Sequence, residues 1–293
     1  MTEPASPSPL ADLSNALAGL VARSAPGIVS VRSHRAWSSG FAWRRGLIVT
    51  ADEALAEEGD IEIVLPGGDT VAARLAGRDP TTDVALLRVD RSDLPPPPVA
   101  AAVAAGALAV ALGAFDGAPT VALGIVSRAG GPWRSLRGGE IDARIELDLG
   151  LERRAEGGLV IDASGQAVGM AVFGPRRRVL VIPSATIDRV AARLETHGRI
   201  ARGYLGLGLQ TVALEGGGAG AMVMSLDPRG PAAAAGIRQG DVIVAWNGET
   251  VRHVQSLLRA LGPDSVGREA VLGLRRADEP REVRLTIAER PAA

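Results

Sequence analysis

Glu156-Gly157-Gly158 stands where a serine-nucleophile motif has the sequence Ser-Gly-Gly. The residues that follow, 159–170, contain two short apolar runs joined by an Asp/Ser/Gly turn, which predicts a pair of strands. A carboxylate cannot replace a serine hydroxyl in acyl transfer, because that mechanism needs a hydroxyl that a neighbouring base deprotonates. The motif therefore predicts a site that keeps its scaffold and has lost its nucleophile.

The elements that must hold this motif are mostly short strands. Strand-like runs cover residues 28–31, 46–50, 61–65, 71–76 and 84–89. Strands at this spacing favour an antiparallel barrel or sandwich over alternating βαβ units. The stiff stretch Pro95–Pro98 separates this block from a second β block at residues 108–182. The sequence therefore predicts two β units of similar size joined by a strap.

Helical spacing of apolar residues predicts a helix over residues 11–24, after a flexible start. A second helix is expected over residues 184–195, with Ser184 as its N-cap. A third block begins at Arg202 and mixes strands with two short helices, at 231–235 and 254–261. Its roughly 90 residues are enough for one small domain.

Composition narrows the possible functions. The chain has 293 residues with a formal net charge of −1, so no overall field favours nucleic acid or an anionic membrane. All 32 basic residues are arginine, and there is no cysteine for disulfides, thiol catalysis or thiolate metal sites. The start of the chain lacks the basic residues and continuous apolar core of a secretory signal, and no run is long enough for a membrane span. We expect a cytoplasmic protein, or a periplasmic one if the start is misassigned.

The third block resembles a PDZ domain of the bacterial HtrA type. The residues that carry the resemblance are Gly203-Tyr204-Leu205-Gly206-Leu207, Gly230-Pro231-Ala232, Gly236-Ile237, Gly240-Asp241-Val242-Ile243 and Asn247-Gly248. Such domains bind an extended peptide as an added strand at a sheet edge.

The resemblance implies that Tyr204, Leu205, Gly206 and Leu207 form the loop whose backbone N–H groups receive the terminal carboxylate of the peptide. Leu257, Leu258 and Leu261, at helical spacing, either line the groove or belong to the core, and at least one of them is expected in the core.

The first two blocks resemble the chymotrypsin-type double barrel of HtrA/DegP-like serine proteases. Besides the motif at Gly157-Gly158, the resemblance rests on residues 27–31, 39–41, 47–50, 77–87 and 121–127. It implies a mostly β fold: a trypsin-like double β-barrel at residues 21–198, followed by a small α+β PDZ domain at residues 202–290. Residues 1–20 would form a flexible tail and the start of the N-terminal helix.

The resemblance implies that one residue of the family's catalytic triad is retained in this chain and that two are replaced. The family's aspartate falls on Asp83, its histidine on Glu53 and its serine on Glu156. The oxyanion loop also departs from the pattern, because Arg154-Ala155 replaces a glycine-containing turn. A serine mechanism needs a hydroxyl, a base near pKa 7 to deprotonate it and donors for the oxyanion, and the base and nucleophile positions here carry glutamate.

The histidines do not repair this loss. His34 lies in an early strand or loop, and His197 and His253 lie beyond the barrels, so each is most simply a surface residue. The resemblance therefore implies a catalytically degenerate family member.

The three carboxylates and a run of three arginines each have an alternative interpretation. The three carboxylates can in principle perform acid–base chemistry or hold a hard cation. A solvated cleft, or ion pairs with Arg153, Arg154 or Arg44, is the simpler expectation, so no metal and no cofactor is expected. The run Arg176-Arg177-Arg178 is expected to be a solvated turn, and the alternative is a docking patch for acidic partners.

The leading hypothesis is an inactive HtrA-like protein that binds peptides or protein C-termini through its PDZ domain, as a scaffold or as a regulator of an active relative. The first alternative is an active serine endopeptidase in protein quality control, which would need Ser127 or Ser164 as nucleophile. The second is a structural subunit of a hetero-oligomer. Family members commonly form trimers through aromatic contacts near the N-terminus, but the first aromatic residue here is Trp37.

Overall fold

A computed structural model describes residues 8–291, except 35, 58, 92, 215, 216, 278 and the side chain of residue 264. The chain forms two compact units. One contains the residues up to Trp133 together with Glu140–Arg199, and the other contains Arg134–Gly139 together with the residues from Ile200 onward. Each unit has its own apolar core.

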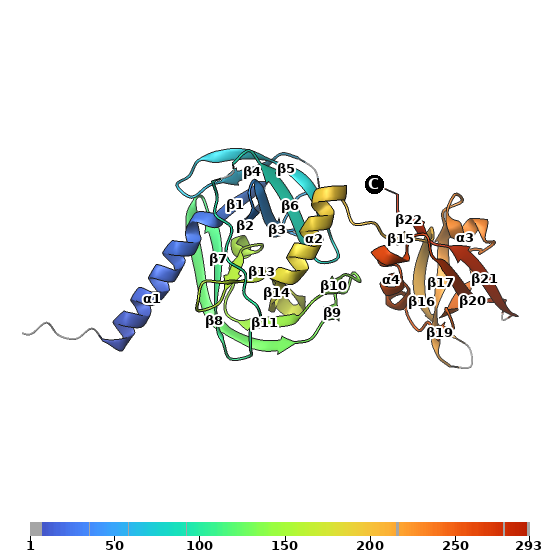
Figure 1. Ribbon diagram of the computed structural model, residues 1–293. Helices are drawn as coiled ribbons and strands as arrows, with labels where there is room; N and C mark the ends of the chain where they lie inside the picture. The colour runs from blue at the N-terminus through green and yellow to red at the C-terminus, as the bar shows by residue number, and fades with distance from the viewer. Residues whose placement is uncertain are drawn as a thin grey trace, which may run out of the picture. The chain divides into compact units, whose positions relative to one another are not determined.

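The first unit contains two closed antiparallel barrels, which confirms the predicted double barrel (Figure 1). Around the first barrel, the order is β1 (Ile28–Ser33), β2 (Ala36–Arg44), β3 (Leu47–Ala51), β6 (Val84–Val89), β5 (Thr70–Asp79) and β4 (Ile61–Val64). Around the second, it is β11 (Arg144–Asp148), β14 (Val179–Pro183), β13 (Ala167–Phe173), β12 (Leu159–Ile161), β7 (Leu108–Phe115) and β8 (Ala118–Gly130). The short strands β9 (Trp133–Arg134) and β10 (Glu140–Ile141) pair with each other.

Turn chemistry fixes the register of the second barrel. Asp116 and Gly117 join β7 to β8 with positive φ angles of 52° and 77°, as a two-residue hairpin turn requires. The hairpin places Phe115 opposite Ala118 and carries the pairing back to Leu108 opposite Ile125. β7 also packs against β1 and β2, so it joins the two barrels.

The helices of the first unit differ from expectation at the start of α1 and at the cap and end of α2. Helix α1 covers Pro9–Ser24, two residues more than predicted, because Ser8 caps it by accepting a hydrogen bond from the Leu10 N–H (3.3 Å). Helix α2 covers Ser184–His197 and ends at Gly198, whose φ is 69°. The expectation that Ser184 is the N-cap is wrong: the cap position is Pro183, and the buried Ser184 hydroxyl donates to the Ala167 carbonyl (2.9 Å). Single 3₁₀ turns cover Ala25–Gly27, Arg153–Ala155 and Pro175–Arg177.

The second unit is an antiparallel sheet with two short helices (Figure 1). Its main sheet has the order β16 (Leu207–Ala213), β17 (Ala219–Leu226), β18 (Val242–Trp246), β20 (Glu269–Arg276) and β21 (Glu279–Thr286), and β19 (Glu249–Thr250) pairs with β18. The remaining elements are β15 (Gly203–Tyr204), which pairs with β22 (Ala288–Glu289), helices α3 (Pro231–Ala234) and α4 (Val254–Ala260), and a 3₁₀ turn at Pro263–Ser265. The order leaves β16 at an edge of the sheet.

A buried ion pair anchors this sheet. Asp241 is 1% exposed, and its two carboxylate oxygens accept hydrogen bonds from Nε and Nη2 of Arg276, both at 2.8 Å. The N–H of Arg238 also donates to Asp241 (2.8 Å). Burial alone would raise the pKa of Asp241, but these hydrogen bonds outweigh it and lower the pKa. The pair thus fixes the start of β18 against the end of β20.

Candidate functional site

The carboxylates at the expected triad positions lie on three loops of the first unit. Glu53 follows β3, Asp83 lies in the turn between β5 and β6, and Glu156 follows the 3₁₀ turn Arg153–Ala155 and precedes β12. The first two belong to one barrel and the third to the other. They interact electrostatically with one another, so the fold brings the three positions into one region.

Glu53 and Asp83 are in direct contact. The N–H of Glu53 donates to Oδ1 of Asp83 (2.8 Å), and the N–H of Asp52 donates to the Asp83 carbonyl (3.3 Å). Asp83 has a φ of 60°, a left-handed conformation that aspartate and asparagine adopt more easily than most residues. The turn therefore aims the Asp83 carboxyl at the loop after β3. That loop supplies a backbone donor and an exposed glutamate, not a histidine ring.

The surroundings of the Asp83 and Glu156 carboxyl groups oppose their ionisation. Burial raises the pKa of Asp83 to about 7; the hydrogen bond from Glu53 lowers it, and the charges of Glu53, Glu156 and Asp52 raise it. Burial likewise raises the pKa of Glu156, against the lowering effect of its hydrogen bond from the Phe173 N–H (3.2 Å). A carboxyl with a pKa of about 7 can exchange protons near neutral pH. The hydrogen bonds that Asp83 and Glu156 accept here come from the backbone N–H groups of Glu53 and Phe173, not from a hydroxyl.

The loop that carries Glu156 is fixed by the packing between the barrels. Gly157 has a φ of 82°, and a Cβ there would meet the Ser39 carbonyl, Thr50 Oγ1 (2.7 Å) and the Ala51 nitrogen (2.8 Å). The N–H of Ser39 donates to the Glu156 carbonyl (2.9 Å). Glycine is therefore required at position 157 by β2 and β3, whatever residue precedes it.

The backbone amides of this loop are already used within the fold. Glu156 N–H donates to the Arg153 carbonyl (3.3 Å), Gly157 N–H to Ala171 (2.8 Å) and Gly158 N–H to Ala155 (3.0 Å). The Arg154 carbonyl accepts from Ser39 Oγ (2.6 Å), and the Arg154 guanidinium lies 4.0 Å from the centre of the Phe115 ring. An oxyanion hole needs N–H groups that point at the reacting oxygen. Here the amides of residues 156–158 donate to protein carbonyls instead.

The histidines lie elsewhere in the fold. His34 occupies the exposed turn between β1 and β2, and His197 is exposed at the end of α2. His253 precedes α4 in the second unit, where its ring contacts Ser256 Oγ (3.2 Å). The two alternative nucleophiles, Ser127 and Ser164, have no histidine among their hydrogen-bond partners in the described residues. Ser127 Oγ donates to the Glu146 carbonyl (3.1 Å), and Ser164 lies in the exposed turn after β12, where its backbone N–H donates to Asp162 Oδ1 (2.8 Å).

The arginines divide into those near the site and those elsewhere. Arg153 and Arg177 lower the pKa of Glu156 through their charges. The expectation that Arg44 pairs with the site is wrong. Arg44 lies at the end of β2 and forms ion pairs with Asp188 (2.6 Å) and Glu195 (3.2 Å) on α2. Across the described part of the chain, no group of three acidic or histidine side chains is arranged to hold a metal ion.

The run Arg176-Arg177-Arg178 is an exposed turn between β13 and β14. Arg176 and Arg177 both have positive φ angles, and Arg178 forms an ion pair with the buried Glu146 (3.3 Å). The expected solvated turn is therefore confirmed, with one member of the run committed to an ion pair.

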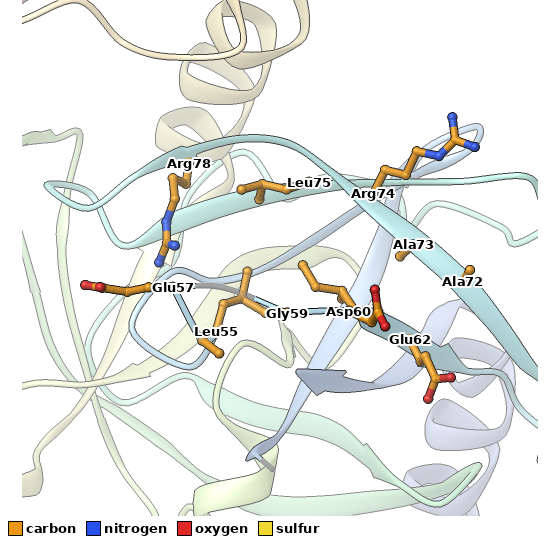
Figure 2. A pocket seen from close by; sticks show the side chains of 12 residues that line it. Leu55, Glu57, Gly59, Asp60, Glu62, Ala72, Ala73, Arg74, Leu75 and Arg78 are labelled. Carbon is orange, nitrogen blue, oxygen red and sulfur yellow. The ribbon is translucent and has the colours of Figure 1, made fainter. Parts of the chain in front are cut away.

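A groove on the first barrel was not foreseen. It has a volume of about 570 Å³ and is lined by residues of the loop before β4 and by β5. Figure 2 shows Arg78 extending toward the loop that carries Leu55 and Glu57, and Arg74 extending away from the groove. Arg78 also forms an ion pair with the buried Asp52, next to Glu53. No local sequence motif marked this groove, because its walls come from segments twenty residues apart.

The second candidate site is the edge of the sheet in the second unit. β16 packs against α4, and the N–H of Val254 at the start of α4 donates to Thr211 Oγ1 on β16 (3.2 Å). The loop that precedes β16 is tied at both ends: Tyr204 Oη donates to Asp227 (3.0 Å), and the Gly206 carbonyl accepts from the Asp227 N–H (2.8 Å). The edge strand and the helix therefore lie side by side, which is the arrangement expected for the two sides of a peptide-binding groove.

The loop residues predicted to bind a carboxylate have available donors. Among the described residues, no acceptor takes a hydrogen bond from the N–H groups of Leu205 and Gly206. Gly206 has a φ of 76°, and a Cβ there would meet Gly230 Cα at 3.0 Å. The Leu205 side chain is buried and Leu207 is half-buried. Leu257 lies in the core, whereas Leu258 is 46% exposed.

Comparison with known proteins agrees with this architecture. Residues 38–170 match the model of the trypsin-like peptidase domain, and residues 203–287 match that of the PDZ domain. The chain is 34% identical over 264 residues to the "Probable periplasmic serine endoprotease DegP-like" of Brucella suis biovar 1 (strain 1330), covering 84% of this chain and 51% of that protein. It therefore spans about half the length of the curated relatives that it matches.

Solved structures show the same fold. The serine endoprotease from Yersinia pestis superposes with a TM-score of 0.71 at 26% identity, covering 93% of this chain and 97% of that one. The HtrA-type protease AlgW with a decapeptide gives a TM-score of 0.71 at 22% identity, covering 94% and 99%. In the described residues, no helix is long and apolar enough to cross a membrane.

Proposed function

Because the chain is HtrA/DegP-like, with a trypsin-like serine protease fold and a PDZ domain, we propose that it binds peptides or protein C-termini and does not cleave them. The binding site is the groove between β16 and α4, with Tyr204, Leu205, Gly206 and Leu207 around the terminal carboxylate. The double barrel serves as a scaffold or as a regulator of an active relative. The peptide-binding domain is residues 202–290.

The observation that carries the binding half is the pair of backbone donors at Leu205 and Gly206, which lack acceptors among the described residues and precede an edge strand. Backbone N–H groups without acceptors are suited to an anion such as a carboxylate. An edge strand offers its backbone groups to an added strand. The relative AlgW, whose structure was solved with a decapeptide, has the same fold.

The catalytic half of the proposal rests on the expected triad. Carboxylates stand at the base and nucleophile positions, and the amides of residues 156–158 donate to protein carbonyls. Serine catalysis requires a hydroxyl, a base and an oxyanion hole together. The absence of all three at the expected positions supports this half of the proposal more strongly than the absence of the serine alone.

A peptide titration tests the binding half. Fluorescein-labelled decapeptides from a library of C-terminal sequences are titrated with the full chain, each as the free acid and as the C-terminal amide. We expect saturable anisotropy changes for a subset of free acids and at least tenfold weaker binding of the matching amides, because the amide lacks the charge that the loop receives. Equal binding of acids and amides, or no binding of any free acid, contradicts the proposal.

The name of the relatives, serine endoprotease, supports a second candidate function, an active endopeptidase of protein quality control that uses Ser127 or Ser164. The same name places those relatives in the periplasm. Fractionation of the native cell against marker proteins of both compartments decides the location. Co-purification from that cell tests whether an active relative or another subunit is bound.

A further inference from the structure

We propose that the groove on the first barrel, between β5 and the loop before β4, binds an extended basic segment of a partner protein, which adds to the open edge of β5 as a further strand. This site is separate from the peptide-binding region proposed for the second unit. Three features support it: a stretch of strand edge to which no described strand pairs, a leucine left exposed at that edge, and two carboxylates on the facing loop.

The open edge arises because β5 is longer than the strand beside it. β4 pairs with β5 only as far as Ala73, whereas the pairing of β5 with β6 continues to Asp79. On the side where β4 has ended, pairing resumes at Arg78, which forms an isolated bridge with Arg199. Within the described part of the chain, no strand pairs with residues 74–76 on that side. Such an edge presents backbone N–H and C=O groups to which another segment can pair.

Leu75 is left exposed where β4 ends. Val71 and Ala73, which precede it on the same face of β5, pack against the apolar core of the first barrel. Leu75 continues this row of side chains, yet it is 43% exposed. Leu55 and Ile61, which also line the groove, are buried and half-buried. An aliphatic side chain of an added strand would cover Leu75, and removal of this apolar surface from water favours binding.

The charges of the groove favour a basic ligand. Of its two arginines, Arg74 extends away from the groove (Figure 2) and Arg78 forms an ion pair with the buried Asp52. Glu57 and Asp60 lie exposed on the facing loop, and no ion pair to either is found among the residues that the structure describes. The other carboxylate of the lining, on β4, is already paired with an arginine of β1. The groove is therefore complementary to a cationic side chain.

The groove has room for a short extended segment. Its volume of about 570 Å³ falls within the roughly 300–1,000 Å³ of sites that hold ligands in proteins. The open positions of β5, residues 74–76, offer roughly 10 Å of edge. Successive side chains of a strand point to opposite faces. A segment that meets both the exposed leucine and the carboxylates therefore alternates aliphatic and basic residues.

A pair of amidated peptides tests the ligand class. A fluorescein-labelled heptapeptide of alternating valine and arginine is titrated with the full chain at low ionic strength, and a peptide with glutamate in place of arginine is its matched probe. The C-terminal amide removes the carboxylate that the loop before β16 is proposed to receive. We expect saturable binding of the arginine peptide, at least tenfold tighter than that of the glutamate peptide. Equal binding of the two peptides, or no binding of either, overturns the inference and leaves the proposed function of the second unit standing.

Matched double variants test the carboxylates. Glu57→Gln combined with Asp60→Asn removes both charges at constant size, and should weaken binding of the arginine peptide by about fivefold, because each exposed ion pair contributes modestly. Asp90→Asn combined with Glu249→Gln makes the same change of net charge at exposed positions outside the groove, and should bind as wild type does. Equal losses in the two double variants would show that binding responds to net charge alone, and would contradict the site.

A matched pair of leucine variants tests the apolar wall. Leu75 and Leu108 are both 43% exposed, but Leu108 lies on β7 of the other barrel. Leu75→Ala should weaken binding of the arginine peptide at least threefold, and Leu108→Ala should leave it unchanged, with circular dichroism as the check that both variants fold. Binding that is unchanged in Leu75→Ala, or lowered equally in both, contradicts the placement of the ligand against Leu75.

N-methylation of the arginine peptide tests the strand pairing. In an added strand, every second residue directs its N–H and C=O groups toward the edge of its neighbour. Of two peptides methylated at the even or at the odd backbone nitrogens, one should therefore retain binding and the other should lose it. Equal effects of the two methylation patterns would contradict strand addition at β5.

Discussion

Asp83 retains a carboxyl group in a half-buried turn among other carboxyl groups. In an active triad a histidine would share this place and stabilise the carboxylate. Here the loop offers only the Glu53 N–H, at 2.8 Å, and the charges of Asp52, Glu53 and Glu156 oppose ionisation. The residue therefore lowers the stability of the fold once it is charged.

Asp83→Asn tests this directly. The pKa of Asp83 is raised from 3.8 to about 7 on folding, so the folded state favours the protonated carboxyl. The contribution of Asp83 to the free energy of unfolding is therefore fully present below pH 4 and is lost as the pH rises through 7. An asparagine stays neutral, tolerates the φ of 60°, and can still accept from Glu53. Above pH 7.5 the variant should be more stable than wild type by on the order of 3 kcal/mol, with no gain at pH 4. Urea unfolding at the two pH values measures the difference.

Asp116→Asn is the matched control. Asp116 also has a positive φ, 52°, but it is exposed in the hairpin turn after β7. A surface substitution of this kind should change stability by less than about 0.5 kcal/mol at either pH. An Asp83→Asn variant that gains no more at high pH than Asp116→Asn would show that the Asp83 carboxyl is not frustrated.

At the scale of elements, Gly157 and Gly158 belong to the packing between barrels. A Cβ at Gly158 would meet the Leu112 carbonyl on β7, as one at Gly157 would meet β2 and β3. These contacts explain why the Gly-Gly pair persists beside a glutamate. Packing therefore requires the Gly-Gly pair, whatever residue stands at position 156.

Gly157→Ala should therefore destabilise the first unit by about 3 kcal/mol or more, since it adds a backbone clash to a positive φ. Gly67→Ala is its control: Gly67 has a φ of 96°, but a Cβ there meets no atom within 4 Å. Its cost should be about 1–2 kcal/mol, the conformational term alone. Equal losses of stability in the two variants, measured by urea unfolding, would mean that the loop does not depend on this close approach.

Most of the elements could be predicted from the sequence. Apolar runs and turn residues marked the strands of both barrels, and Asp116-Gly117 marked its hairpin. The N-cap of α2 was missed because Ser184 turns its hydroxyl to a barrel carbonyl, a tertiary contact that local sequence does not contain. The family resemblance implied that Glu53, Asp83 and Glu156 lie together. It could not show that the amides of residues 156–158 donate within the fold, because their acceptors depend on the turn at Arg153–Ala155.

At the scale of the whole molecule, a trypsin-like fold and a PDZ domain have different requirements. The barrels keep their strands, their glycine contacts and one aspartate of the triad, and the PDZ domain keeps an edge strand and a loop with available donors. The match to a curated relative described as a serine endoprotease covers 51% of that protein. These features are the basis on which we propose binding without hydrolysis.

Proteolysis by the full chain tests this conclusion most directly. Fluorescein-labelled casein is incubated with the chain for a day at pH 7.5, with and without a serine-directed phosphonate, and the fragments are identified by mass spectrometry. The account predicts no phosphonate-sensitive fragment, because the expected triad positions 53, 83 and 156 carry carboxylates, which supply neither a hydroxyl nor a histidine ring. Cleavage that the phosphonate blocks, and that Ser127→Ala or Ser164→Ala abolishes, would contradict it.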